Sequence, residues 1–171
     1  MGRACVFIDG GYFQKILEKD FQKPRIDFDR IGPLLSKQYD EFLRTYYYNC
    51  PPYQSASPSP AERRLISNAD RFYYSLKNLN SFEVRLGRLA FRGIDRDTGE
   101  PIFQQKRVDV QLAVDLVTLA FSKQIRHCLK TRLQRTGRCQ TAFVSRPARA
   151  VGPAASGRTV LFRQSLVRQA L

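Results

Sequence analysis

Strand and helix patterns alternate through the first two thirds of this chain, and this alternation constrains the fold more than any other sequence feature. A short apolar run, Ala4–Ile8, is typical of a buried strand, and Asp9-Gly10-Gly11 follows it as a tight, backbone-permissive turn. Further strand patterns occupy residues 42–48 and 82–91, and helical spacing of apolar residues occupies 12–21, 29–35, 62–79 and 108–122. Strands that alternate with helices of this length predict an α/β domain built on a mainly parallel sheet.

Proline and polar residues refine two of these segments. Pro33 is compatible with the helix of residues 29–35 only in its first turn, because a proline further along removes a helical hydrogen bond. Asp95–Gly99 is typical of a polar turn, so we expect it to join the strand of residues 82–91 to Ile102-Phe103 as a hairpin.

The acidic residues are confined to one part of the chain. All 15 Asp and Glu and 18 of the 29 Lys and Arg lie in residues 1–115, whereas residues 116–171 hold the other 11 cations and no acid. The net charge of +14 therefore belongs mainly to the last third. Periodicity also weakens beyond residue 125, although residues 141–144 and 159–162 are compatible with short strands. We therefore expect an α/β domain in residues 1–125 and a basic, Arg-rich tail in residues 126–171.

Two origins of this tail stay open. Enrichment in Arg, Ala, Gly, Pro and Ser without acids is what translation of GC-rich DNA in a shifted reading frame would give. The rival interpretation is a genuine basic arm, because a run of like charge is common in nucleic-acid-binding tails.

The sequence gives little indication of a membrane-spanning helix or of a zinc site. No apolar run approaches the roughly 20 residues that a helix needs to cross a bilayer. The four cysteines form no CxxC pair, so reduced thiols are expected rather than a zinc site. We expect a cytoplasmic protein without a membrane partner.

Asp9 is the first candidate functional carboxylate. In an open parallel sheet, ligands bind beyond the carboxyl ends of the strands, and Asp9 lies at such an end. Gly10 and Gly11 follow it and would let a substrate or an ion approach. Asp9 is equally suited to capping the helix that begins after it.

Asp109 and Asp115 are the other two candidates, and both lie in the helix of residues 108–122. This helix is apolar on most sides, so we expect it to pack deep against the sheet. Asp109 near its start is also explained by the helix dipole, and Asp115 by a solvated polar stripe that includes Gln111. On a regular helix the two side chains would lie about 120° and 9 Å apart, so one ion would not bind both directly.

Four segments in this order resemble the NYN domain, a relative of the PIN-like nucleases that includes the LabA-like proteins. The segments are Val6–Phe13, Tyr46–Pro52, Arg85–Leu89 and Lys106–Asp115, and the resemblance covers residues 4 to about 125. It implies a three-layer α/β/α fold and a metal-dependent ribonuclease acting on RNA, with single-stranded RNA as the expected partner.

The resemblance also implies roles for individual residues. Asp9, Asp109 and Asp115 match the acidic site that binds Mg²⁺ or Mn²⁺ in the family, and Lys106 matches a lysine that would hold a phosphate. Hard divalent ions prefer such carboxylate oxygens, and they activate water and neutralise charge on a scissile phosphate.

The chain departs from the family after Asp115. A Gly-Asp-Ser-Asp type motif, which supplies further acids, is expected there and is absent. An alternative function is therefore a non-catalytic RNA-binding remnant that uses its basic tail. The aromatic residues Tyr46, Tyr47, Tyr48 and Tyr53 are compatible with base stacking or, more simply, with a strand that alternates rings into the core.

Overall fold

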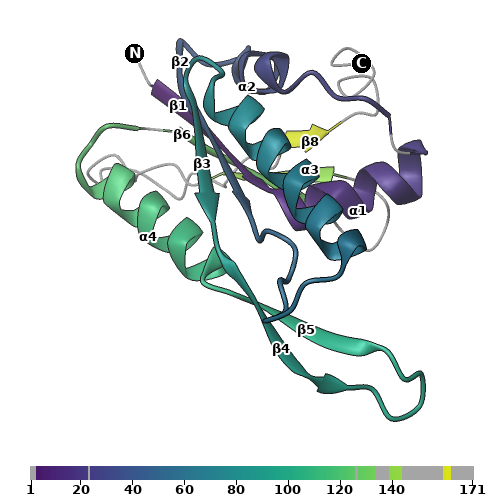
Figure 1. Cartoon of the computed structure of the whole chain (residues 1–171). Coiled ribbons are helices and arrows are strands. Elements are labelled where there is room, and N and C mark those ends of the chain that lie inside the picture. Colours follow the sequence, from purple (N-terminus) through teal and green to yellow (C-terminus); the bar gives the residue numbers. More distant parts are fainter. Residues whose placement is uncertain (1–2, 23, 126, 134–138, 144–159, 163–171) are drawn as a thin grey trace.

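The computed structural model describes residues 3–22, 24–125, 127–133, 139–143 and 160–162 of the 171-residue chain (Figure 1). Its helices are α1 (Gly10–Phe21), α2 (Phe28–Ser36), α3 (Pro60–Lys77) and α4 (Val108–Phe121). Its strands are β1 (Arg3–Asp9), β2 (Glu41–Asn49), β3 (Phe82–Leu86), β4 (Arg88–Ile94), β5 (Pro101–Lys106), β6 (His127–Leu133), β7 (Cys139–Phe143) and β8 (Val160–Phe162). Strands and helices alternate as the sequence pattern predicts.

One sheet forms the centre of the fold, with strand order β3-β2-β1-β6-β7-β8. The strands β3, β2, β1 and β6 run parallel to one another, whereas β7 pairs antiparallel with both β6 and β8. The predicted α/β class with a mainly parallel sheet is therefore confirmed. Because β1 lies between β2 and β6 and is covered on both faces, every residue from Ala4 to Ile8 is fully buried.

The two faces of the sheet carry separate hydrophobic cores, which makes the fold three-layered. Alternate β1 side chains point to opposite faces: Val6 and Ile8 pack with α1, α2 and α3, whereas Cys5 and Phe7 pack with α4. Figure 1 shows α4 on one side of the sheet and the other three helices on the opposite side. The expected α/β/α arrangement is thus present.

Side-chain caps fix where the first three helices begin. Asp9 caps α1, Asp27 caps α2, and Ser59 with Glu62 forms a reciprocal capping box at α3, where Pro60 occupies the first helical position. The expectation for Pro33 is wrong, since α2 begins at Phe28 and Pro33 lies beyond the first turn.

The strand pattern of residues 82–91 is divided between two strands. Gly87 separates β3 from β4, and its N–H donates to the Asn49 carbonyl at 2.8 Å. From there β4 leaves the sheet and pairs with β5 as an antiparallel hairpin that extends from the body of the molecule (Figure 1). The predicted turn at Asp95–Gly99 lies at the tip of this hairpin.

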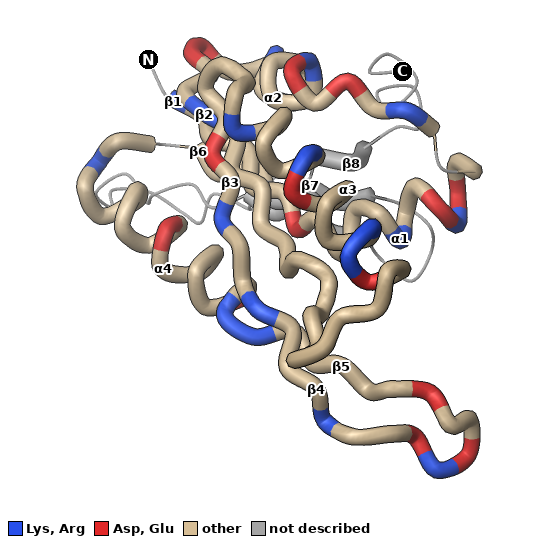
Figure 2. Tube along the Cα trace, in the orientation of Figure 1, with Lys and Arg blue, Asp and Glu red and all other residues tan. Residues whose placement is uncertain are grey.

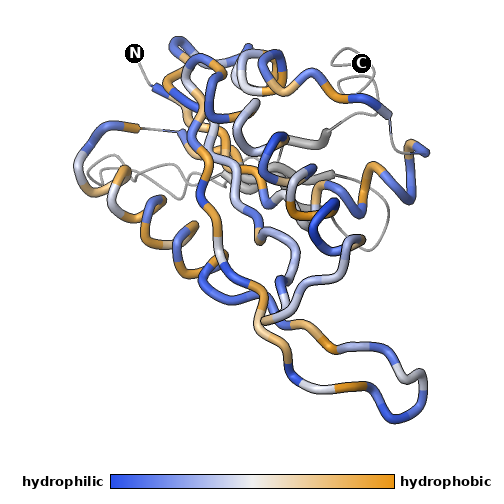
Figure 3. The backbone as a smooth tube through the Cα atoms, in the orientation of Figure 1, coloured by the Kyte–Doolittle hydropathy of each residue, from blue (hydrophilic) through white to orange (hydrophobic). Residues whose placement is uncertain are grey.

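Helix α4 is less buried than its composition predicts. Val108, Leu112 and Leu119 pack against the sheet, but Val114 and Phe121 on other faces are 56% and 88% exposed. Figure 3 shows the resulting apolar colouring along much of this helix. The expectation of deep packing therefore holds for one face only. Among the described residues, no helix has both the length and the apolar composition needed to cross a membrane.

The sheet continues past residue 125, where we place the boundary of the domain from the sequence. Backbone pairing joins β6 to β1, with Cys5 opposite Cys128, and β7 and β8 extend the sheet further. The two short strands suggested by the sequence at residues 141–144 and 159–162 overlap β7 and β8. Residues 126, 134–138, 144–159 and 163–171 of the basic segment lie outside the described residues.

Candidate functional site

The carboxyl ends of the three parallel strands β1, β2 and β3 meet at one edge of the sheet. Asp9 ends β1, Asn49 ends β2, and Gly87 follows β3 directly. Parallel sheets place their ligand sites at this edge, because loops and helix starts gather there. The edge therefore contains the first predicted site residue, Asp9, and an amide that the sequence analysis did not single out.

Three polar atoms lie close to the position that a side chain on Gly11 would take. A Cβ placed on Gly11 would lie 2.9 Å from Nε2 of Gln105 and 3.7 Å from Oδ1 of both Asn49 and Asp9. The position of the missing side chain is therefore bounded by two oxygens and one amide nitrogen. We call Asp9, Asn49, Gln105 and the Gly11 backbone the polar cradle.

Asn49 is fixed in the cradle by hydrogen bonds on both ends of its amide. Its Oδ1 accepts from the Cys50 N–H at 2.8 Å, and its Nδ2 donates to the Tyr47 hydroxyl at 3.3 Å. The residue is buried, so these bonds determine which way the amide faces. A carbonyl oxygen carries two lone pairs, and Oδ1 thus retains acceptor capacity toward the cradle.

Asp9 combines the two roles that the sequence left open. Its Oδ1 accepts from the Tyr12 N–H at 3.0 Å, which is a helix N-cap, and the same oxygen borders the cradle. Capping of α1 is therefore compatible with a place for this carboxylate in the cradle.

Asp109 acts on the same region through its charge. Burial is the main cause of a raised pKa at the Cys50 thiol, a backbone hydrogen bond from Lys106 opposes it, and the Asp9 and Asp109 carboxylates raise it further. Both acids are thus close enough to influence one buried group next to Asn49.

Asp115 lies on α4 and is bound by side chains of β2 and β3. Its Oδ2 accepts a hydrogen bond from the Tyr48 hydroxyl at 2.9 Å and another from Arg85 Nε at 3.3 Å. The side chain is only 24% exposed, so the interpretation of Asp115 as part of a solvated stripe is wrong. Gln111, one turn earlier, has a buried Oε1 that lacks a hydrogen-bond partner among the described residues.

Four cations surround the start of α4. Arg88 lies directly opposite Lys106 in the β4–β5 pair, Arg107 precedes the helix, and Arg85 binds Asp115. Figure 2 shows this concentration of positive charge where β3 passes into β4 and where α4 begins. Arg107 adopts a left-handed backbone with φ of 76°, and this conformation turns the chain from β5 into α4.

The structure thus brings together some of the predicted site residues. Asp9 and Gly11 belong to the cradle, Gly10 packs against the buried Tyr47 ring, and Asp115 is bound to Tyr48 and Arg85. Within the part of the chain that is described, no three His, Cys, Asp or Glu side chains are close enough to hold a metal ion together. Two cradle residues, Asn49 and Gln105, are not among the predicted site residues; Asn49 lies within the Tyr46–Pro52 segment, whereas Gln105 directly precedes the Lys106–Asp115 segment.

The tyrosines of β2 are core residues, as alternation predicts. Tyr47 packs with the core under α1, α2 and α3, whereas Tyr46 and Tyr48 stack with Phe7 in the core under α4. Tyr53 differs from them, because it contacts the β4–β5 hairpin instead.

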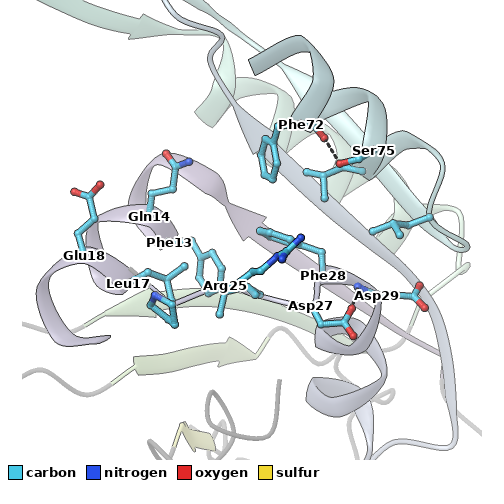
Figure 4. Close-up of a pocket in the computed structure, with 14 residues that line it drawn as sticks. Phe13, Gln14, Leu17, Glu18, Arg25, Asp27, Phe28, Asp29, Phe72 and Ser75 are labelled. Atoms are coloured by element: carbon cyan, nitrogen blue, oxygen red, sulfur yellow. Dashed lines mark hydrogen bonds between the residues drawn. The ribbon is translucent and has the colours of Figure 1, made fainter. Parts of the chain in front are cut away.

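A separate cavity of about 600 Å³ lies among α1, α2 and α3, on the face of the sheet that these helices cover. Figure 4 shows Phe13, Phe28 and Phe72 around its interior, with Arg25 and Asp27 among the polar residues that line it. None of the predicted site residues lines this cavity, so it is distinct from the polar cradle.

Comparisons of the chain with protein-family models, with curated proteins and with solved structures give no match. The site must therefore be interpreted from its own chemistry.

Proposed function

We propose that this chain is a metal-dependent ribonuclease of the NYN type that acts on the phosphodiesters of single-stranded RNA. The observation that carries the proposal is the polar cradle, where oxygen atoms of Asp9 and Asn49 lie 3.7 Å from the position that a side chain on Gly11 would take. The resemblance of four ordered segments to the NYN domain supports the same conclusion.

The cradle is chemically suited to Mg²⁺ or Mn²⁺. Such ions prefer oxygen ligands and usually retain several waters, so they bind through one or two carboxylates rather than through a complete protein cage. Asp9 and Asn49 would hold the ion, and the Asp109 carboxylate would add negative charge nearby. When bound, the ion supplies an activated water and neutralises charge on the phosphate.

The chain's own cations would orient the substrate. Lys106 and Arg88 lie side by side at the base of the hairpin, next to Gln105 of the cradle. Cationic side chains supply the phosphate contacts that position a nucleic acid without reading its sequence. We infer that these two residues hold a backbone phosphate beside the cradle, while Asp115 positions Tyr48 and Arg85.

We place this activity in the cytoplasm. Cys5 and Cys50 are buried thiols that form no disulfide, and reduced cysteines are typical of reducing compartments.

Cleavage of labelled single-stranded RNA tests the proposal, with Asp9→Asn as the decisive variant. Asparagine caps a helix about as well as aspartate, so the variant should fold while losing the charge of its carboxylate. Asp27→Asn is a matched control, because Asp27 caps α2 in the same manner, with the Asp29 N–H at 3.1 Å. We expect Mn²⁺-dependent cleavage by the parent and by Asp27→Asn, and at least about a hundredfold loss in Asp9→Asn, since it removes a ligand of the catalytic ion.

Metal binding gives a second readout that does not depend on turnover. Calorimetric titration with Mn²⁺ should show binding to the parent and to Asp27→Asn, and much weaker binding to Asp9→Asn. Cleavage that persists in Asp9→Asn, or Mn²⁺ binding that this substitution leaves unchanged, would refute the proposed site.

Binding of RNA without cleavage is the second candidate function. It is favoured by Asp115, whose carboxylate is already occupied by two protein donors, and by the four cations at the start of α4. This function predicts salt-sensitive RNA binding in the presence of Mn²⁺ with no cleavage, and Lys106→Ala should weaken that binding.

A further inference from the structure

The β4–β5 hairpin carries aromatic side chains that are exposed to solvent. Phe91 and Phe103 lie directly opposite each other and remain 47% and 41% exposed. Their ring centroids are 6.0 Å apart, and Tyr53 lies 6.2 Å from Phe91 and 5.1 Å from Phe103. Three rings thus form one aromatic group at the surface, which we call the aromatic platform.

The platform faces the same way as the cradle residue Gln105. Residues two apart on a strand share a face, and so do residues directly opposite across a pair. Phe103 and Gln105 are two apart on β5, and they lie opposite Phe91 and Leu89 on β4. The rise of a strand places Phe103 and Gln105 about 7 Å apart along β5. Since Nε2 of Gln105 lies at Gly11 as part of the cradle, the aromatic platform adjoins the cradle.

Charge is arranged along the hairpin in a way that suits a polyanion. Arg88 and Lys106 pair at its base, and Arg92 donates from Nε to Gln104 at 2.7 Å midway along it. The acidic residues Asp95, Asp97 and Glu100 are confined to the tip, as Figure 2 shows. An anionic chain would therefore be attracted to the base of the hairpin rather than to its tip.

A hollow of about 550 Å³ lies where the platform meets the body of the molecule. Tyr53, Phe91 and Arg88 line it together with Pro51 and Pro52. Rings and prolines supply flat apolar surface, and Arg88 supplies a cation. A planar ring attached to a phosphate matches this combination.

We propose that Tyr53, Phe91 and Phe103 bind an unpaired nucleobase of single-stranded RNA, and that they thereby place the adjoining phosphodiester at the polar cradle. Bases within a duplex are already stacked on their neighbours, whereas a single strand offers free base faces to aromatic side chains. Every base has such a face, so the platform selects single-stranded RNA without selecting its sequence. This inference rests on the proposed function, because the cradle is its second contact.

Fluorescence anisotropy in EDTA tests the platform separately from cleavage. The probe is a short fluorescein-labelled oligouridylate, compared with an abasic oligomer of the same length and with an RNA duplex. Base stacking on an aromatic side chain contributes about 1–3 kcal/mol, which corresponds to about a 5- to 100-fold change in affinity. We expect Phe103→Ala to lose affinity for oligouridylate by this factor, and Phe103→Tyr to retain it.

Phe121→Ala is the matched control, because Phe121 is 88% exposed at the end of α4, away from the hairpin. It should bind oligouridylate like the parent, and the abasic oligomer should bind parent and Phe103→Ala equally. Equal binding of oligouridylate by Phe103→Ala and the parent would overturn the inference. So would a parent that binds the duplex more tightly than the single strand, or a dimer in sedimentation that Phe103→Ala dissociates.

The two proposals can fail independently in these experiments. Cleavage that depends on Asp9 but not on Phe103 would refute the platform and leave the nuclease. Binding that depends on Phe103, with no cleavage under any metal, would support the platform and refute the nuclease.

Discussion

The hydroxyl of Tyr48 donates a hydrogen bond of 2.9 Å to the Asp115 carboxylate and so joins the end of β2 to the middle of α4. Arg85 of β3 contacts the same oxygen at 3.3 Å. The rest of the α4 interface consists mainly of apolar side chains such as Leu112 and Leu119. These two polar contacts therefore fix the position of α4 along the sheet, which apolar contacts specify less strictly.

Tyr48→Phe should lower the free energy of unfolding by about 1.5 kcal/mol, since a hydrogen bond to a charged group contributes about 1.5–3 kcal/mol and Asp115 keeps Arg85 as a partner. The ring itself is fully buried and stays in place in this variant. Urea denaturation measures the change. Tyr74→Phe is the control, because Tyr74 is 69% exposed and its substitution should change stability by less than about 0.5 kcal/mol. Equal stability of Tyr48→Phe and the parent would show that the contact contributes nothing.

Alkaline pH should destabilise the fold. Burial raises the pKa of the Cys5 thiol from 9.0 to about 11 and that of the Tyr73 hydroxyl from 10.0 to about 12. Burial and the hydrogen bond to Asp115 also raise the pKa of Tyr48. These groups stay protonated in the folded chain while the unfolded chain ionises, so their contribution is complete below about pH 9 and is lost as the pH rises.

Urea midpoints measured from pH 7 to pH 11 check this expectation. The free energy of unfolding should be constant up to about pH 9 and should then fall by on the order of 2–4 kcal/mol by pH 11. Tyr73→Phe removes one of the groups and should make the decline between pH 10 and pH 11 shallower. A profile that rises with pH in this range would contradict the burial of these groups.

The part of the site that could be predicted from sequence is local in the chain. An apolar run that ends in Asp9-Gly10-Gly11 identifies a strand, its carboxyl end and an open turn within a few residues. Asn49 and Gln105 reach the same place through the parallel pairing of β2 with β1 and through the path of the hairpin. Asn49 lies within the Tyr46–Pro52 segment, but no short-range pattern shows that its amide, or that of Gln105, comes to lie beside Asp9 and Gly11.

Asp115 and β6 illustrate the same limit for the fold. Helical spacing groups Asp115 with Gln111 on one face, but only the placement of α4 across β2 and β3 shows that this face meets Tyr48. The strand β6 mixes charged and apolar residues in His127–Leu133, so it lacks the alternation of an ordinary strand. Its pairing with β1, more than 100 residues earlier, places it in the sheet.

Gly10→Ala should be strongly destabilising, because a Cβ at Gly10 would lie 2.4 Å from the fully buried Tyr47 ring. Overpacking of this kind costs about 1–3 kcal/mol or more. At Gly11 the nearest atom is the flexible amide end of Gln105, at 2.9 Å. Gly11→Ala should therefore fold with a stability within about 1 kcal/mol of the parent, helped by the higher helix propensity of alanine.

A comparison of Gly10→Ala with Gly11→Ala separates effects on stability from effects on metal binding. Gly11→Ala fills the polar cradle, so we expect weaker Mn²⁺ binding in calorimetry from a chain that unfolds at nearly the parent's urea midpoint. Unchanged Mn²⁺ affinity in Gly11→Ala would place the ion somewhere other than the cradle.

Two apolar residues of α4 should respond differently to the same kind of truncation. Leu112 is 5% exposed and packs against the sheet, so Leu112→Ala should lower the free energy of unfolding by about 2–5 kcal/mol through lost burial and a residual cavity. Val114, half a turn away, is 56% exposed, and Val114→Ala should change stability by less than about 0.5 kcal/mol. Urea denaturation of both variants at low protein concentration makes the comparison. A large loss of unfolding free energy in Val114→Ala would mean that another part of the chain covers the outer face of α4 in solution. It would contradict the prediction that only the sheet-facing side of this helix contributes to stability.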